Sequence, residues 1–386
     1  MNIRTFDVYD APCNKSKSDE VKKIAKIGVD ATKKYIYNMV KNEKENTIAS
    51  EIEKNFEVAV KDDSKDLDKA FAIAVLRYAT RDENFSEDDL SLLKDPNFVS
   101  RTDFQERYYE VVNTVLTTTI PAVTTTFLGR IAEVKSVPYG DTARFDIESN
   151  EIFQVSRSAS GILFGANQRK YVKTVTVNPY DTNITFDTDW YQMASGIFDF
   201  GKNFYRASAG YSHFFTALAY KKFGELITTV PAAYKLSGWS DKTAREVISA
   251  VQSANNNVPV SLFGTKVALG NVVPENDFMK FGISEEWTVK GYIGSWSGYS
   301  LVEAMQLLNP TTINEATTRD FLVNNDKIWI LPMNGRRPIK IVFEGTMFTV
   351  QKSAMDTVDM VEKASLHYRV GVEAVYDQIY GEIQLA

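Results

Sequence analysis

The feature that most constrains the fold of this chain is one long apolar stripe between residues 198 and 229. Its members recur at the three- and four-residue spacings of a helix: Phe200, Phe204, Ala207, Tyr211, Phe214, Leu218 and Leu226. The same segment contains Gly201, Gly210 and Gly224, and each glycine costs a helix about 1 kcal/mol relative to alanine. We therefore expect a helix that ends at Pro231 and is stabilised by packing against a sheet.

The segments after this helix predict a mixture of helices and strands. A helix capped by Ser240 is expected to run to about residue 254, and Ser300 with Glu303 resembles the capping box of a second helix. Strands are expected at residues 258–262, 267–269, 287–292, 328–331, 339–343, 348–350 and 366–372, where apolar residues alternate or form short runs. The chain therefore belongs to the α+β class.

The first 100 residues differ from the rest in charge. They hold 17 Lys or Arg and 20 Asp or Glu, whereas the following 286 residues hold 27 and 30. Apolar stripes at helical spacing run through residues 21–39, 48–60 and 67–78, and each is too narrow to be buried alone. We expect an N-terminal helical domain over residues 1–100, folded as a small bundle.

The segment between this domain and the long helix changes texture at residue 117. A helix capped by Thr102 is followed by runs of threonine, which favour extended chain over residues 117–130. Two hairpins are expected next. The first pairs residues 132–134 with residues 143–147, and the second pairs residues 171–177 with residues 184–186 across the turn at 178–181.

The residues that carry most enzyme chemistry are scarce. The chain has one cysteine, Cys13, and two histidines, His213 and His367, so a disulfide within the chain is impossible and a zinc site is not expected. No phosphate-binding loop, nucleophile elbow or zinc-protease motif occurs, and residues 294–298 (GSWSG) are interpreted as a turn. Only a carboxylate-pair glycosidase stays open among enzymes. We expect no catalytic residues, no cofactor and no metal.

Charge and hydropathy also bound the partners. The net charge of −6 gives no sign of dedicated nucleic-acid binding. Arg336 and Arg337 follow a turn and are more simply solvated than phosphate-binding. No segment approaches the roughly 20 apolar residues of a membrane span, and the N-terminus lacks the apolar run of a signal peptide. We expect a protein made in the cytoplasm, with no membrane partner.

The order of these elements resembles the major capsid proteins of tailed bacteriophages, the Hong Kong 97-like fold that encapsulins share. An extended arm, a protruding two-stranded loop, one long helix, an α/β domain and returning strands follow one another in both. The ending Tyr368-Arg369-Val370-Gly371-Val372-Glu373-Ala374 resembles the last strand of that family. The resemblance covers about 270 residues, and the N-terminal 100 residues depart from it.

The resemblance implies a division of the chain. The expected parts are the helical domain (1–100), a linking helix, N-arm and first hairpin (101–147), an extended loop (148–190), the spine helix of a peripheral domain (191–231), an axial domain (232–325) and the return strands of the peripheral domain (326–386). The extended loop is expected to lie over a neighbouring subunit, close to its long helix. Its candidate contact residues are Arg169, Lys170, Tyr171, Val175, Ile184 and Phe186.

The function implied is that of a major capsid protein. Many copies would form the hexamers and pentamers of an icosahedral shell around double-stranded DNA, which is contacted non-specifically, in a virion assembled in a bacterial cytoplasm. Portal, scaffolding or decoration proteins are possible partners. The alternatives are an encapsulin-like shell around a cargo protein and, from another class, a carbohydrate-active enzyme or lectin. Sedimentation separates the shell proteins from the enzyme, and the contents of the particles separate the two shells.

Overall fold

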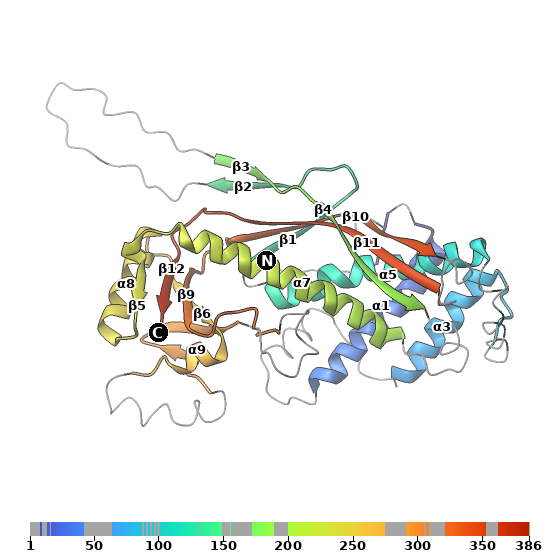
Figure 1. Cartoon of the computed structure of the whole chain (residues 1–386), viewed down its shortest axis with the longest axis horizontal. Helices are drawn as coiled ribbons and strands as arrows, with labels where there is room; N and C mark the ends of the chain where they lie inside the picture. The colour runs from blue at the N-terminus through green and yellow to red at the C-terminus, as the bar shows by residue number, and fades with distance from the viewer. Residues whose placement is uncertain are drawn as a thin grey trace, which may run out of the picture.

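Figure 1 shows the computed structural model of the chain. It describes residues 8–9, 14–15, 17–41, 64–86, 89, 92, 95, 98, 101–129, 131–148, 155, 172–188, 200–274, 291–304, 306–308, 321–352 and 362–385. The helices are α1 (Asp19–Lys41), α3 (Ser64–Thr80), α5 (Thr102–Leu128), α7 (Phe200–Thr228), α8 (Asp241–Ala254) and α9 (Lys266–Gly270), with a short 3-10 turn at Ala232–Tyr234. The strands are β1 (Ala132–Val137), β2 (Arg144–Glu148), β3 (Val172–Thr176), β4 (Tyr180–Thr188), β5 (Lys235–Ser237), β6 (Val260–Gly264), β7 (Ser295–Trp296), β8 (Tyr299–Glu303), β9 (Lys327–Pro332), β10 (Ile339–Lys352), β11 (Glu362–Ala374) and β12 (Gly381–Gln384).

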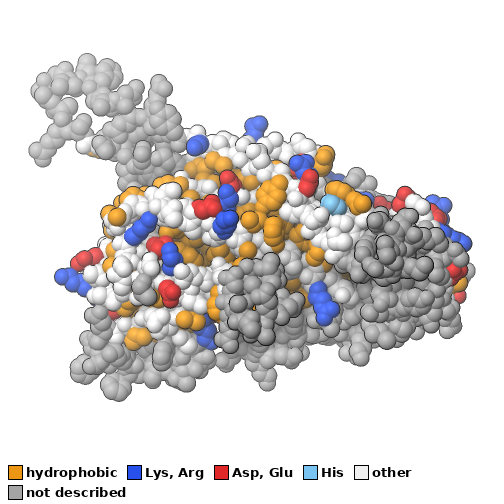
Figure 2. All heavy atoms as spheres, in the orientation of Figure 1, with side chains coloured by type: hydrophobic (Ala, Val, Ile, Leu, Met, Phe, Trp, Pro, Cys, Tyr) orange, Lys and Arg blue, Asp and Glu red, His pale blue; other side chains and the backbone are white. Residues whose placement is uncertain are grey.

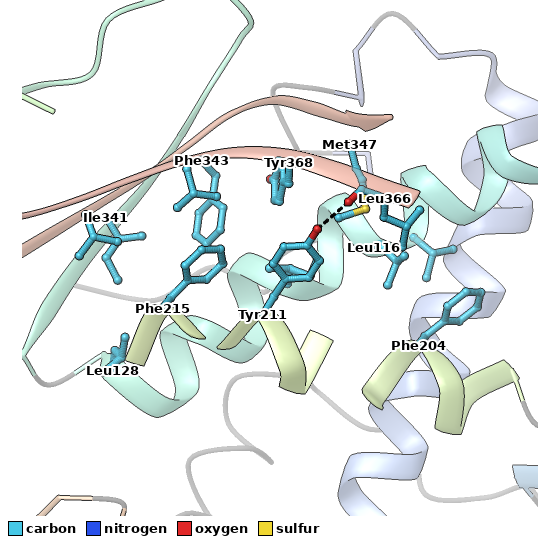
Figure 3. Packing of buried hydrophobic residues seen from close by; sticks show 14 of the residues in the cluster. Leu116, Leu128, Phe204, Tyr211, Phe215, Ile341, Phe343, Met347, Leu366 and Tyr368 are labelled. Carbon is cyan, nitrogen blue, oxygen red and sulfur yellow. Dashed lines mark hydrogen bonds between the residues drawn. The ribbon is translucent and has the colours of Figure 1, made fainter. Parts of the chain in front are cut away.

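The main body is a sheet covered on one face by two long helices. The sheet has the strand order β1-β10-β11-β4, and α5 and α7 lie against it (Figure 1). From α7, Tyr211 and Phe215 point at the strands, and the rings of Phe215 and Phe343 meet edge to face at 5.5 Å (Figure 3). The hydroxyl of Tyr211 donates a hydrogen bond to the Leu366 carbonyl at 2.9 Å. The expected long helix and its packing on a sheet are confirmed.

The threonine-rich segment is helical, so the expectation of an extended arm over residues 117–130 is wrong. Helix α5 continues through Pro121 to Leu128. Several hydroxyls return to the helix's own carbonyls, as Thr118 does to Thr114 and Thr124 to Ile120. The threonine hydroxyls therefore find hydrogen-bond acceptors inside a buried helix. Packing overrides the preference of isolated β-branched residues for strands.

Helices α1 and α3 pack on the far side of α5 and α7, away from the sheet. Phe71 of α3 is fully buried, and its ring meets that of Phe204 from α7 at 5.5 Å. At Gly28 a Cβ would lie 2.6 Å from the Phe71 ring, so only glycine allows α1 this close. One continuous hydrophobic core thus runs from α1 and α3 to the sheet. The expected helix over residues 48–60 lies outside the described residues, and the domain boundary near residue 100 stays a prediction.

A second sheet lies beside the C-terminal end of α7 (Figure 1). Its strand order is β5-β12-β9-β6-β8-β7, and α8 packs on it. Its core contains Ile248, Leu262 and Ile330. The strands β9 and β12, which come from the region expected to return to the first domain, belong to this second sheet, whereas β10 and β11 return to the first. The other boundaries predicted after residue 190 stay predictions.

Both expected hairpins are wrong. Strand β1 pairs in parallel with β10, and β2 pairs with β3 instead of β1. Strand β4 pairs with β11, more than 170 residues along the chain, instead of folding back on β3. Alternation identifies a strand but carries no information about its partner, and neighbours in sequence were the wrong choice in both cases.

Two smaller elements also differ from expectation. Residues 267–269 lie in α9, whose start is capped by the Thr265 hydroxyl accepting the Ala268 N–H, instead of in a strand. Residues 300–303 lie in β8, which pairs with β6, instead of opening a helix. The GSWSG segment is the β7–β8 hairpin, turning at Ser297 and Gly298, both with positive φ, as interpreted from the sequence.

Candidate assembly site

Strands β2 and β3 form a two-stranded ribbon that stands off the main sheet (Figure 1). Five residue pairs run from Arg144 opposite Thr176 to Glu148 opposite Val172. Among the described strands the ribbon has no further partner. An isolated pair of strands is at best marginally stable in water, so the ribbon depends on how its base is attached to the body.

An apolar cluster attaches the base of the ribbon to the outer face of the main sheet, opposite α5 and α7. It consists of Ala143, Phe145, Val177 and Val342, with Val137 packed against it. Phe145 is 2% exposed. At Gly371 a Cβ would lie 2.7 Å from the Val177 side chain and 2.9 Å from the Asn178 carbonyl oxygen. Glycine therefore leaves the space in which the chain crosses β11 on its way from β3 to β4.

Two lysines cover the Phe145 ring. The ammonium groups of Lys135 and Lys340 lie 4.1 and 5.4 Å from its centroid, within the range of cation–π attraction. Glu133 forms ion pairs with both, with its carboxylate oxygens 2.7 Å from Lys340 Nζ and 3.5 Å from Lys135 Nζ. Lys135 also donates to the Arg144 carbonyl at 3.0 Å, which ties β1 to the first residue of the ribbon.

The ionisation of Glu133 reflects this surrounding. Burial alone would raise the pKa of the Glu133 carboxyl, but the hydrogen bond and charge of Lys340, with the charge of Lys135, outweigh it, so the pKa is lowered. The carboxylate is thus charged at neutral pH, and it offsets one of the two positive charges beside the ring.

The expected contact residues do not form one group. Arg169, Lys170 and Tyr171 lie outside the described residues. Val175 is in β3 opposite Phe145. Ile184 is in β4 and packs against the core of its own subunit, and Phe186 pairs with Ala364 of β11 through the backbone. Whether any of the six contacts a neighbour stays a prediction.

The face of α7 seen in Figure 2 carries a strip of apolar side chains bordered by charges. Phe214 of α7 is 43% exposed, and Tyr180, at the start of β4, is 42% exposed. Lys222 of the same helix forms ion pairs with Glu225 and Glu373 at 3.7 and 3.5 Å. An apolar strip with a charged rim is typical of a surface that another protein chain covers.

The histidines and arginines considered as candidates for catalysis or ligand binding contact other parts of the fold. His213 lies in α7, where burial lowers the pKa of its imidazole, and the His367 ring stacks on Phe348 at 5.0 Å. Arg337 is partly buried and donates to the Ala132 carbonyl at 3.0 Å, so the interpretation that it is simply solvated is wrong. Within the described ranges no group of acidic, histidine or cysteine side chains could hold a metal ion. No helix in that part of the chain has the length and hydropathy to span a bilayer.

Sequence reasoning placed Phe145 in a hairpin with β1 and missed its role as the anchor of the ribbon. It also missed Gly371, Glu133 and Lys340. One signal was available: a glycine inside an alternating strand often marks the close approach of another segment. Glu133 and Lys340 form an ion pair although they are 207 residues apart in the chain, so no local pattern could have joined them.

Comparison with protein families defines the class of this protein. A family model matches residues 94–384, and it describes capsid proteins derived from a prophage. The chain belongs to this family, "SPbeta prophage-derived putative capsid protein YonB". The expectation of a phage capsid protein, a subunit of the shell, is confirmed. No curated protein matches the sequence.

Solved structures include similar chains. The mature capsid of bacteriophage PhiM1 is similar at 11% identity and a TM-score of 0.43, covering 66% of this chain and 85% of that one. The capsid of an empty GTA particle is similar at 11% identity and a TM-score of 0.44, covering 67% and 89%. A virus-like particle from Pyrococcus furiosus is similar at 10% identity and a TM-score of 0.37, covering 69% and 98%.

Proposed function

We propose that this chain is the major capsid protein of a tailed bacteriophage and assembles, without catalytic activity of its own, into hexamers and pentamers of an icosahedral shell around double-stranded DNA. The family match over residues 94–384 carries this proposal. Assembly would take place in the host cytoplasm. Portal, scaffolding and decoration proteins are further partners we propose, and the DNA is held by volume and sparse contacts, since the chain is acidic.

The ribbon supplies a mechanism for joining copies. Its base is fixed to the body by Phe145, while Val172 at its far end is 63% exposed. We propose that the segment between Glu148 and Val172 reaches a neighbouring subunit and that the apolar strip around Phe214 receives it. Each such contact is weak alone, and repetition around a closed shell multiplies its effect.

A deletion tests this mechanism. Residues 149–171 are replaced by Asn-Gly, which closes β2 and β3 with the tight turn that such hairpins prefer. Circular dichroism should match the wild type, because the anchor and the main sheet are kept, and electron microscopy should show no closed shells. Normal shells from the deletion variant would contradict the mechanism.

A pair of substitutions tests the receiving strip. Phe214→Lys places a charge on the exposed face of α7 and should block assembly of a folded subunit. Phe214→Leu keeps the apolar surface and should assemble. Equal assembly by both variants would show that the strip is not an interface.

An encapsulin-like cargo shell is the second candidate, because the fold resemblance covers both kinds of shell. Purified particles separate the two. Nuclease-protected DNA inside the particles supports the phage capsid, whereas a folded enzyme inside them supports the cargo shell.

A further inference from the structure

The two segments that connect the ribbon to the body both cross the outer face of the main sheet. The entering segment is the turn at residues 138–141, between β1 and β2, and the leaving segment is residues 177–181, which connects β3 to β4 and includes the first two residues of β4. Beneath them lies a row of three charged residues on neighbouring strands. Glu344 of β10 is opposite Arg369 of β11, which is opposite Asp181 of β4.

Two residues of the row, Glu344 and Arg369, contact the entering segment. The carboxylate of Glu344 accepts the Gly140 N–H at 2.9 Å, and the Arg369 guanidinium lies 5.4 Å from the centroid of the Tyr139 ring. Gly345, at φ +71°, bends β10 at its bulge, and a Cβ there would lie 3.3 Å from Tyr139. Tyr139 is 76% exposed, so its position against the sheet comes from these contacts and not from burial in a core.

The same arginine grips the leaving segment. Arg369 Nε lies 3.3 Å from an Asp181 carboxylate oxygen, and its Nη2 donates to the Pro179 carbonyl at 3.5 Å. Its Nη1 lies 3.1 Å from Glu344. One planar guanidinium therefore joins both segments, a geometry that the single ammonium group of a lysine cannot reproduce.

Burial strengthens the contact of Arg369 with Glu344 but not the one with Asp181, whose side chain is 70% exposed. The Glu344 side chain is only 5% exposed and that of Arg369 is 30% exposed. Exposed ion pairs contribute little because water screens them, but a desolvated carboxylate that also accepts a backbone hydrogen bond holds its partners more firmly. The apolar core lies on the opposite face of the sheet, so this row fixes the connecting segments without forming part of that core.

We propose that Arg369 and Glu344 are positioning residues that set the direction in which the ribbon leaves the subunit, and thereby the curvature at which copies join. This rests on the proposed function, because direction matters only if the ribbon reaches a neighbour. Phe145 holds the base of the ribbon down, and the Arg369–Glu344 pair fixes its angle. The pair thus acts on the uniformity of the shell more than on the stability of the subunit.

The test uses Arg369→Lys in the full chain. Lysine keeps the positive charge beside Glu344 and Asp181 but loses the fork that reaches Pro179 and the flat surface that meets Tyr139. The matched control is Lys327→Gln, which breaks a pair of similar burial between β9 and β12: Lys327 and Glu382, at 2.9 Å, with side chains 32% and 12% exposed. A second variant, Tyr139→Ala, loosens the entering segment from the surface and cannot disturb the core.

Two readouts are compared. Hydrogen exchange at Gly140 and across residues 177–181 should become about tenfold faster or more in Arg369→Lys and in Tyr139→Ala, as expected for local opening, but not in Lys327→Gln. Electron microscopy should show shells of mixed size or open sheets from Arg369→Lys and uniform shells from Lys327→Gln. Thermal midpoints within a few degrees of each other would separate positioning from unfolding.

Exchange in Arg369→Lys equal to that in the control would overturn the proposal, and so would uniform shells despite faster exchange. If Arg369→Lys fails to fold, Tyr139→Ala alone decides by the same two readouts. Failure of the proposed function looks different, because the wild type itself would then form no shells.

Discussion

The attachment of the ribbon can be tested by removing its anchor with Phe145→Ala. Phe145 is 2% exposed and packs in a cluster with Ala143, Val177 and Val342, apart from the main core. Loss of a buried phenylalanine costs about 3–5 kcal/mol of stability. Each of the cation–π contacts to Lys135 and Lys340, which the substitution also removes, contributes about 0.5–2 kcal/mol. Because the cluster lies outside the main core, we expect the cost to fall on the attachment of the ribbon and not on global unfolding.

The magnitude sets the expected signal. A loss of about 3–4 kcal/mol makes local opening more frequent by two to three powers of ten, since each tenfold step is about 1.4 kcal/mol. Hydrogen exchange at the β2–β3 pairs, from Phe145 opposite Val175 onward, should accelerate accordingly up to the limit set by global unfolding. The urea midpoint of the far-ultraviolet circular dichroism should move little.

Phe215→Ala provides the matched comparison. Phe215 is fully buried in the main core, where its ring meets Phe343 at 5.5 Å. Its loss should lower the global unfolding free energy by about 3–5 kcal/mol and leave the ribbon's local opening unchanged. If Phe145→Ala shifts the urea midpoint as far as Phe215→Ala and leaves ribbon exchange unaltered, the ribbon is not held by a separate cluster and the reasoning fails.

Three further predictions concern the body of the subunit. Removing residues 1–98 should give an insoluble or partly unfolded product, detected by dye binding and circular dichroism, because α1 and α3 bury the shared core of α5 and α7; a soluble, cooperative product would favour a separable domain. The buried hydroxyls of Thr119 and Ser208 meet at 3.0 Å, so Ser208→Ala should cost about 1–2 kcal/mol in urea unfolding, and the double variant Thr119→Val with Ser208→Ala should cost less than the sum of the singles. The lowered pKa of Glu133 means that its stabilisation is present above its unfolded pKa of about 4.3 and is lost as pH falls through the lower folded value; the stability advantage of the wild type over Glu133→Gln should therefore shrink in thermal melts as pH falls below about 4.3.

Local patterns in the sequence identified the helices and strands whose own apolar residues follow a clear helical or alternating period. Helix α7 was predictable from its stripe, although its glycines weaken it, but one member of the stripe was wrong, because Phe214 is 43% exposed and Phe215 is buried in its place. Strands β9, β10 and β11 were predictable from runs and alternation. Helix α5 was predicted only in its first half, since nothing local shows that its threonines are buried between α7 and β10, where the Thr117 hydroxyl accepts the Met347 N–H.

The candidate site was less accessible because its contacts are long-range. The Gly140–Glu344 bond and the Lys340–Glu133 pair each join residues more than 200 positions apart. The pairing of β2 with β3 could be predicted only if β4 was already known to pair with β11. The family resemblance supplied the idea of a projecting loop, and the structure supplied its base, in Phe145, Gly371 and Arg369, which no spacing rule could select.

The central claim, that this chain builds a shell, is tested most directly by electron microscopy of the purified full-length protein, with sedimentation on the same sample. The account predicts closed, uniform particles in the megadalton range, far above the 43.5 kDa of one chain. A preparation that is folded by circular dichroism yet stays a monomer or small oligomer, at capsid-forming concentrations and with DNA or co-expressed phage proteins supplied, would contradict it.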